Sequence, residues 1–449
     1  MLTTLAAPAF AATWRIEDGN ITVKAGDTEG TNKVSQGTII DKVDTNTIIT
    51  NSDKATASSN TVTIDAEDHK VEVTLDNVNI KADSGSALTS KGDVTLTLKG
   101  DNHLTGGNGD TYGGDGITSS GSLTISGGTV TATGGNSTDS VGSGGSGISS
   151  FNRVAISGST VTANGGDSSS NSGGYGISSL DVAISSGTVT ANGGDSKDGS
   201  GGNGIYSSSG VAISGGAVTA NGGDSKDGSG GNGIYSSSSV AISGGTVTAT
   251  GGDSTGSDGS GGNGIYSRNG SIDLSGSLEL TAKAGSPNGK ALSQNGSELV
   301  LDTIKDKLGP GAKVTATDAD GKVIDQVSTP RPVEPEESSS SSDGGSAAPS
   351  APVSPLPGLT VTDKDGQRIS YTSTQSGNTL TVCVGRFTAS FRISLAALRQ
   401  LRAEGIETIA FQTILCSTTL SVDELLAMGS EDAEAVLTHR FTDSSLTVG

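Results

Sequence analysis

A four-residue segment, Val-Ala-Ile-Ser, recurs along this chain at a nearly constant interval. Successive copies lie 28, 29 and 29 residues apart and begin at Val154, Val182, Val211 and Val240, with looser versions at Leu123 and Ile272. A Gly-Ile pair and a Thr-Val-Thr-Ala segment follow the same period, and the stretches Gly193–Ser209 and Gly222–Ser238 are identical. A fixed period of this length is typical of repeat proteins, in which each short unit is stable only against its neighbours.

Each repeat holds about three short pieces in which apolar residues alternate with small or polar ones, as in strands with one buried face. Such strands are too short to form a sheet inside one unit, so each must stack on its counterpart in the next unit. We therefore predict an all-β parallel β-helix of roughly three sheets over residues 14–327, closed by an Asp-Gly hairpin at Lys313–Asp325. The first coils are expected to be shorter, because pairing Leu75 with Leu96 spans 21 residues.

The two ends of this repeat region differ from it in composition. Residues 1–13 resemble the remnant of a secretory signal, with a short apolar stretch and an Ala-x-Ala motif at Ala9–Ala11 before Ala12, although a plain disordered N-terminus is the alternative. Residues 328–357 are dominated by Pro, Ser and Glu, which predicts a disordered linker. The signal predicts a secreted or extracellular cell-surface protein.

Residues 358–449 have the pattern of a small α+β domain. An Asp365-Gly366 turn predicts a hairpin, and Ser394 is positioned to cap a helix that Gly405 ends. Further strands are expected at 380–384, 387–393 and 406–415, and a second helix begins with the capping box of Ser421 and Glu424. Both cysteines, Cys383 and Cys416, lie in strand-like apolar runs, which favours buried thiols over a disulfide between them.

Composition excludes several classes of partner. Only 31% of residues are hydrophobic and 3% aromatic, too few for a conventional globular core of this length. The 27 basic residues are outnumbered by 48 acidic ones, for a net charge of −21, which argues against a nucleic-acid ligand. No stretch of 18 apolar residues occurs, so we expect no membrane span.

Aspartates recur in the Gly/Ser segments between strands. Stacking would bring like charges within about 5 Å of one another, a repulsion of roughly 1–4 kcal/mol per neighbour. Calcium would relieve it, because it accepts carboxylate and carbonyl oxygens in flexible geometry; the alternative is that these loops splay apart in solvent, helped by Lys197 and Lys226. The candidate calcium ligands are Asp167, Asp195, Asp198, Asp224, Asp227 and Asp253.

Three tyrosines, Tyr206, Tyr235 and Tyr266, each follow the inward-facing Ile of a Gly-Ile pair. Strand alternation therefore points their rings outward, where they are candidates to contact a glycan. The alternative is that the rings stack on each other along the repeat as an aromatic ladder.

The stretch Val71–Gly107, with its Leu-Asp-Asn-Val-Asn-Ile run and the later Leu-Lys-Gly-Asp-Asn-His-Leu-Thr-Gly-Gly, resembles a known group of proteins. It is similar to secreted bacterial carbohydrate-binding-domain proteins of the right-handed parallel β-helix type, whose best-known members are clostridial pectin binders. The resemblance implies a right-handed helix, binding of acidic polysaccharide and bound calcium.

The sequence thus predicts a secreted or cell-surface β-helix protein that binds carbohydrate, with calcium as a possible aid and without catalysis. Its expected partner is a polysaccharide, such as an acidic glycan, or a host or cell-wall surface. The alternative is an adhesin or structural stalk that presents the C-terminal domain. A polysaccharide lyase or hydrolase is a third reading, but the few His and Arg residues of the repeat region form no recognisable acid, base and electrophile.

Overall fold

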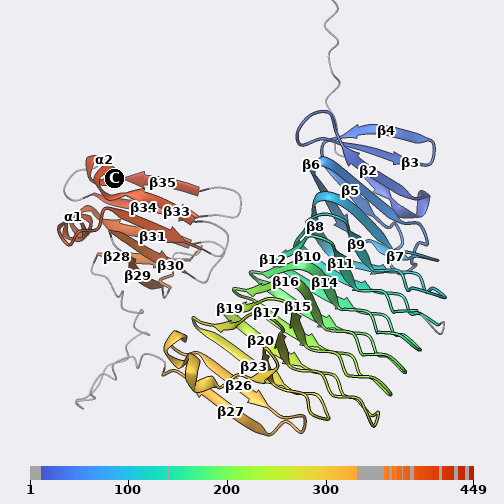
Figure 1. Cartoon of the computed structure of the whole chain (residues 1–449). Coiled ribbons are helices and arrows are strands. Elements are labelled where there is room, and N and C mark those ends of the chain that lie inside the picture. The colour runs from blue at the N-terminus through green and yellow to red at the C-terminus, as the bar shows by residue number, and fades with distance from the viewer. Residues whose placement is uncertain are drawn as a thin grey trace, which may run out of the picture. The chain divides into compact units, whose positions relative to one another are not determined.

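The computed structural model describes residues 12–138 and 142–330, together with 358–448 except for 364–366, 370, 377, 385–388, 414–416, 429–432 and 440–443. The chain divides into two compact units, Met1–Glu336 and Glu337–Gly449, each with its own hydrophobic core. The first unit is a parallel β-solenoid, in which successive coils stack along one axis (Figure 1). The signal-like motif at Ala9–Ala11 and the predicted linker from 331 to 357 lie outside the described residues.

Three columns of parallel strands run the length of the solenoid, as the alternation predicted. Column A contains β2 (Ile21–Ala25), β9 (Ile117–Ser119), β11 (Ile148–Ser150), β18 (Ile234–Ser236), β21 (Ile265–Ser267) and β24 (Leu292–Gln294). Column B contains β1 (Thr13–Arg15), β5 (Thr47–Thr50), β12 (Arg153–Ser157), β19 (Val240–Ile242) and β22 (Ile272–Leu274). Column C contains β7 (Asn79–Lys81), β13 (Ser159–Asn164), β15 (Gly187–Asn192), β17 (Ala217–Asn221), β20 (Gly245–Thr250), β23 (Leu278–Lys283) and β26 (Lys313–Thr317). Five longer strands serve two or more columns: β6 (Val62–Asp76), β8 (Leu88–Thr105), β10 (Leu123–Thr133), β14 (Ile177–Ile184) and β16 (Ile205–Ile213).

Identical residues stack in register from coil to coil, and this builds the core. Val154 pairs with Val182 and Val161 with Val189, so each apolar position forms a buried column. The shorter N-terminal coils pair differently from the prediction: Leu75 lies opposite Leu98, not Leu96. Both leucines satisfy the alternation, and the sequence alone does not distinguish registers two residues apart.

Antiparallel segments close both ends of the solenoid. At the start, η1 (Ile16–Asp18) follows β1, and β2 pairs with β3 (Asn32–Gln36), which pairs with β4 (Ile39–Asp44). At the far end, β25 (Ser297–Glu298) and η2 (Leu301–Lys307) precede a hairpin of β26 and β27 (Val323–Ser328), which confirms the predicted closing hairpin.

The Gly-rich segments were expected to be turns, and loops splayed in solvent were the alternative to a calcium site. They instead form a fourth stacked layer, which we call the glycine fin and define as residues 106–116, 134–138, 142–147, 165–176, 193–204, 222–233, 251–264 and 285–289. In each coil the chain runs out along one leg and back along another, as the long loops to the right of Figure 1 show. Gly202 N donates to Gly194 O across the legs, and Gly223 N donates to Gly202 O in the next coil, both at 2.8 Å.

This zigzag of peptide hydrogen bonds continues from coil to coil and leaves no room for side chains between the legs. A Cβ atom on Gly165 would lie 2.0 Å from Gly174 O, and one on Gly202 would lie 1.9 Å from the same oxygen. At the tips, Ser225 Oγ donates to Gly199 O at 2.6 Å and accepts from Gly228 N at 2.8 Å. The fin is therefore held together by backbone hydrogen bonds and not by apolar packing.

The C-terminal unit is a small α+β fold with two four-stranded sheets. One sheet contains β28 (Leu359–Thr362), β31 (Ala389–Ser394), β34 (Glu434–His439) and β35 (Ser444–Val448). The other contains β29 (Thr372–Ser376), β30 (Thr379–Cys383), β32 (Thr408–Gln412) and β33 (Ser417–Ser421). Among the described residues of this unit the helices are α1 (Leu395–Ala403) and α2 (Val422–Met428).

The predicted limits of the first helix are confirmed, whereas the predicted hairpin and the predicted buried thiol of Cys383 are only partly present. Ser394 accepts from Ala397 N at the start of α1, and Gly405 ends the helix with a φ of 91°. The first predicted hairpin is reduced to a single bridge between Thr362 and Arg368, with its Asp365-Gly366 turn outside the described residues. Cys383 is a free thiol, but it is half-buried on the outward face of β30 and donates to Gln412 Oε1 at 3.3 Å, whereas Cys416 is not described.

Candidate functional site

The predicted outward tyrosines lie on column A and form a ladder. Tyr206, Tyr235 and Tyr266 occupy the second position of β16, β18 and β21 and pair in register. The first two rings are stacked, with centroids 5.2 Å apart and planes 2° apart, while the Tyr266 ring is turned to 76° from Tyr235 at 5.4 Å. The aromatic-ladder alternative is therefore correct for the ring contacts.

A fourth ring extends this ladder, and sequence reasoning missed it. Tyr175 stacks on Tyr206 with centroids 4.7 Å apart and planes 10° apart. It lies two residues before Ile177, not directly after it, so it falls outside the Gly-Ile-Tyr pattern. Burial within the ladder raises the pKa of the Tyr175 hydroxyl. The rings of Tyr175, Tyr206 and Tyr235 are stacked and therefore cover part of one another's faces.

An asparagine ladder runs beside the tyrosines, in the column to which Tyr175 belongs. Asn232 donates both its backbone N and its Nδ2 to Asn203 Oδ1, at 2.8 and 2.9 Å, and Asn263 does the same to Asn232. Lys290 N continues the series by donating to Asn263 Oδ1 at 2.9 Å. Each amide is thereby fixed at the coil spacing.

A cation adjoins this surface. The exposed Arg268 side chain lies two residues beyond Tyr266, and its interaction with the Tyr235 side chain raises the pKa of the guanidinium group. We call the surface made by the tyrosine ladder, the asparagine ladder, Arg268 and Lys290 the tyrosine–asparagine face. It combines aromatic rings, hydroxyl groups, amides and two basic side chains.

The first column of predicted calcium ligands lies on the outgoing leg of the glycine fin and forms a ladder of another kind. Asp195 N donates to Asp167 Oδ1 at 2.9 Å, and Asp224 N to Asp195 Oδ1 at 2.8 Å. Asp253 N then donates to Asp224 Oδ1 at 2.7 Å. One oxygen of each exposed carboxylate is thus held by the next coil's backbone, an arrangement that sequence reasoning did not foresee.

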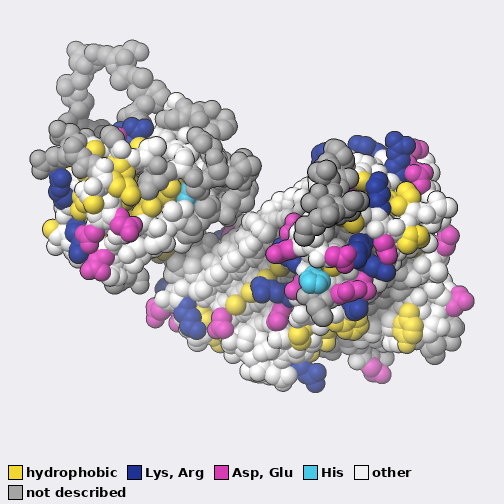
Figure 2. Space-filling view, turned by 90° about the horizontal axis from the view of Figure 1, so that it is seen from above, with side chains coloured by type: hydrophobic (Ala, Val, Ile, Leu, Met, Phe, Trp, Pro, Cys, Tyr) yellow, Lys and Arg dark blue, Asp and Glu magenta, His cyan; other side chains and the backbone are white. Residues whose placement is uncertain are grey.

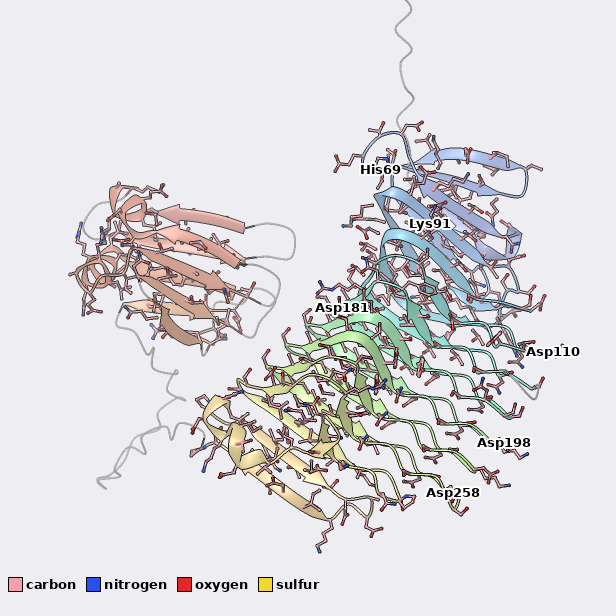
Figure 3. The ribbon with its side chains drawn as sticks, viewed as in Figure 1. His69, Lys91, Asp110, Asp181, Asp198 and Asp258 are labelled. Carbon is pink, nitrogen blue, oxygen red and sulfur yellow. The ribbon has the colours of Figure 1, made fainter. Side chains whose placement is uncertain are left out.

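The second column is at the fin tips, where Figure 3 labels Asp198 and Asp258 on the outer edge of their coils. Asp198 and Asp227 are exposed, and Lys197 Nζ lies 3.7 Å from Asp198 Oδ1. Within the part of the chain that the structure describes, no three His, Cys, Asp or Glu side chains are grouped so as to hold a metal ion. The calcium site therefore stays a prediction.

Charged side chains of both signs gather around a histidine at the N-terminal end of the solenoid (Figure 2). A hollow of about 400 Å³ there is lined by Lys24, Asp27, Lys33, Asp41, Glu67 and His69. Lys33 Nζ and Asp27 Oδ1 are 2.6 Å apart, and this ion pair raises the pKa of the lysine. The hollow is open and strongly charged, unlike the mostly apolar clefts that bind small molecules.

Comparison with known proteins supports the fold. A sequence model of a family described as "Beta helix repeat" matches residues 123–148, 154–179, 182–204 and 240–264. The matched segments lie in the coils of the parallel β-solenoid. Searches of curated proteins and of solved structures gave no match. Among the described residues, neither helix is long and apolar enough to cross a membrane.

Proposed function

We propose that the solenoid is a non-catalytic carbohydrate-binding module of a secreted or cell-surface protein, and that it holds an extended polysaccharide along the tyrosine–asparagine face. The observation that carries the proposal is the in-register repetition of tyrosine and asparagine side chains in adjacent coils. A surface that repeats at the coil spacing of about 4.8 Å presents equivalent groups to equivalent units of a polymer. This suits a repetitive ligand better than a single small molecule.

The chemistry of the face favours a glycan over other polymers. Tyrosine hydroxyls can both donate to and accept from sugar hydroxyl groups, and the Nδ2 of Asn232 and Asn263 each keeps one hydrogen that the ladder does not use and that can donate. The stacked rings cover part of one another's faces, so we expect hydrogen bonding to dominate over ring stacking. Arg268 and Lys290 add charge-assisted hydrogen bonds to carboxylates, which extends the proposal to acidic polysaccharides despite the net charge of −21.

The proposal that the module is non-catalytic rests on the same repetition. An active site needs one distinctive arrangement of acid, base and electrophile, whereas the coils around Tyr206 and Tyr235 present near-identical groups. Calcium is proposed as an optional aid to binding, through the free carboxylate oxygens of the fin.

Glycan-array binding of the full chain tests the proposal, with neutral and acidic polysaccharides in calcium or in chelator. Arg268→Ala should weaken binding of acidic glycans about tenfold or more, the typical effect of losing a charged hydrogen bond. Lys197→Ala, which removes the same charge at a fin tip, is the matched control and should leave affinity unchanged. Equal losses in both variants, or no glycan retained in either buffer, would overturn the proposal.

One observation favours a second function, that of a stalk. The C-terminal unit has its own core and stands beyond the Pro/Ser/Glu-rich stretch, as expected if it carried the binding activity. In that case glycan or surface binding should persist in Arg268→Ala and disappear when residues 358–449 are deleted.

A further inference from the structure

Asp44, the last residue of β4, is a carboxylate in an unusual position. It is 0% exposed, although the other residues of its strand are exposed. Its Oδ2 accepts from Trp14 Nε1 at 2.9 Å, and its Oδ1 accepts from Asn46 N and from Ala12 N, each at 3.1 Å. All three donors are neutral groups of the polypeptide.

A buried carboxylate is strongly destabilising unless a cation or several hydrogen bonds compensate for its lost hydration. Among the described residues no basic side chain forms an ion pair with Asp44. Lys42, on the same strand, lies over the Trp14 ring at 5.5 Å from its centroid. The site therefore has hydrogen-bond donors but lacks a positive charge.

Ala12 is the residue placed to supply that charge. Its backbone nitrogen faces Asp44, and its carbonyl accepts from Ile48 N at 3.3 Å, just before β1 pairs with β5. The Ala-x-Ala motif at Ala9–Ala11, which small-residue-specific signal endopeptidases recognise, immediately precedes it. The motif and the buried carboxylate are independent observations, and both concern the peptide bond between Ala11 and Ala12.

We propose that the chain is cleaved between Ala11 and Ala12 and that the resulting α-ammonium group of Ala12 forms an ion pair with buried Asp44. An endopeptidase hydrolyses the bond: water adds across the C–N bond, Ala11 leaves as a carboxylate, and the Ala12 amine takes up a proton at neutral pH. A neutral N–H donor becomes an ammonium group beside the carboxylate, and charge-assisted hydrogen bonds are roughly twice as strong as neutral ones. Cleavage would therefore stabilise the N-terminal end of the solenoid from β1 to β4, which we call the cap.

The ion pair predicts a characteristic pH dependence. Pairing with Asp44 raises the α-amino pKa above its unfolded value of about 7.7–8.0, so the added stability is complete below that value and is lost as the pH rises through the folded pKa. The other charged side chains on the packed strands are Arg15 on β1 and Lys42 and Asp41 on β4, with Lys33 on β3. None of these side chains is hydrogen-bonded to Asp44, so a transition just above pH 8 that disappears in Asp44→Asn reports on the Ala12 amine.

Trp14 is the only tryptophan in the chain and touches Asp44, so its fluorescence reports on this site. Three forms of the full chain should be compared by denaturant unfolding: one starting at Ala12, one with a single glycine before Ala12, and one starting at Met1. At pH 7 the equilibrium constant for opening of the cap should be about tenfold lower in the Ala12 form than in the other two forms. This difference should vanish near pH 10. Equal stability of the three forms at pH 7 would overturn the ion pair.

Asp44→Asn should abolish the advantage of the Ala12 form, whereas Asp41→Asn, which removes the same charge from an exposed position of β4, should preserve it. If Asp44→Asn does not fold, the reactivity of the Ala12 amine toward an acylating reagent decides whether the ion pair forms. A paired ammonium reacts more slowly in the native protein than the amine of the glycine-extended form, and equal rates exclude the pair. Mass spectrometry of exported protein tests the cleavage itself: a mature chain beginning at Ala12 supports it, and any other start overturns it.

Discussion

Replacing Gly202 with alanine tests whether the glycine fin is held by its backbone. The added Cβ would lie 1.9 Å from Gly174 O, and carbon–oxygen contacts normally lie at about 3.3 Å or more. Gly174 occupies the equivalent position in the preceding coil, so Gly202 would have to move away from that coil by more than about 1 Å. The bonds Gly202 N to Gly194 O and Gly223 N to Gly202 O, each 2.8 Å long, would then exceed hydrogen-bonding distance.

The expected loss of unfolding free energy follows from those two hydrogen bonds. Gly202, Gly194 and Gly223 are buried, and each buried peptide group left without a partner costs about 1–3 kcal/mol. Alanine also reduces the entropy of the unfolded chain, which returns about 0.4–1 kcal/mol. We therefore expect Gly202→Ala to destabilise this part of the solenoid by about 1–5 kcal/mol.

Gly210 provides a matched control in β16. A Cβ there meets its nearest atoms at 3.7 Å, an ordinary contact, so Gly210→Ala should be neutral or slightly stabilising. The assay is hydrogen exchange of the full chain read coil by coil, together with urea unfolding, because long repeat arrays can unfold in parts. If Gly202→Ala leaves protection of coils 193–233 within about 0.5 kcal/mol of the parent, the backbone-packed fin is refuted.

Three further perturbations address other parts of the molecule. Burial lowers the pKa of His439, whose Nε2 lies 2.9 Å from Thr418 Oγ1, so the C-terminal unit should lose stability as the pH falls below about 6.5, and thermal melts of His439→Asn should lack this dependence. Asp224→Asn keeps an acceptor for Asp253 N, so its melting temperature should lie within a degree or two of the parent, whereas Asp224→Ala should lose about 0.5–1.5 kcal/mol of unfolding free energy. If calcium raises the melting temperature of the parent and of Asp224→Asn equally, this column is not the calcium site. Tyr235→Leu removes two ring contacts and should lower the unfolding free energy by about 1–3 kcal/mol, and an unchanged value in urea titrations would show that the ladder adds no stability.

The solenoid was predictable from sequence because its repeated apolar residues recur at positions that must stack. The column that contains Val154 and Val182 follows directly from that period, and so does the outward direction of Tyr206. The pairing of Leu75 with Leu98 did not follow, because a shift of two residues keeps the same face buried.

The fin and the Asp ladder were not predictable from the same patterns. Glycine has no side chain whose periodicity would reveal packing, and the order of the fin lies in backbone bonds such as Gly194 N to Gly174 O. The Asp195 carboxylate suggested repulsion or a metal ligand, since nothing in a sequence shows that a neighbouring coil's N–H points at it. Tyr175 was missed because its ring joins the ladder from the glycine fin, two residues before β14 begins.

The fin also affects how the protein responds to temperature. Unfolding a normal core exposes apolar surface and raises the heat capacity, whereas exposing peptide groups lowers it. The coils from 165 to 264 devote much of their length to glycine legs that bury peptide groups and almost no apolar atoms. Heat-capacity changes of opposite sign therefore partly cancel in each coil. The unfolding free energy of the solenoid should consequently vary less between cold and warm conditions than that of a globular protein of equal length.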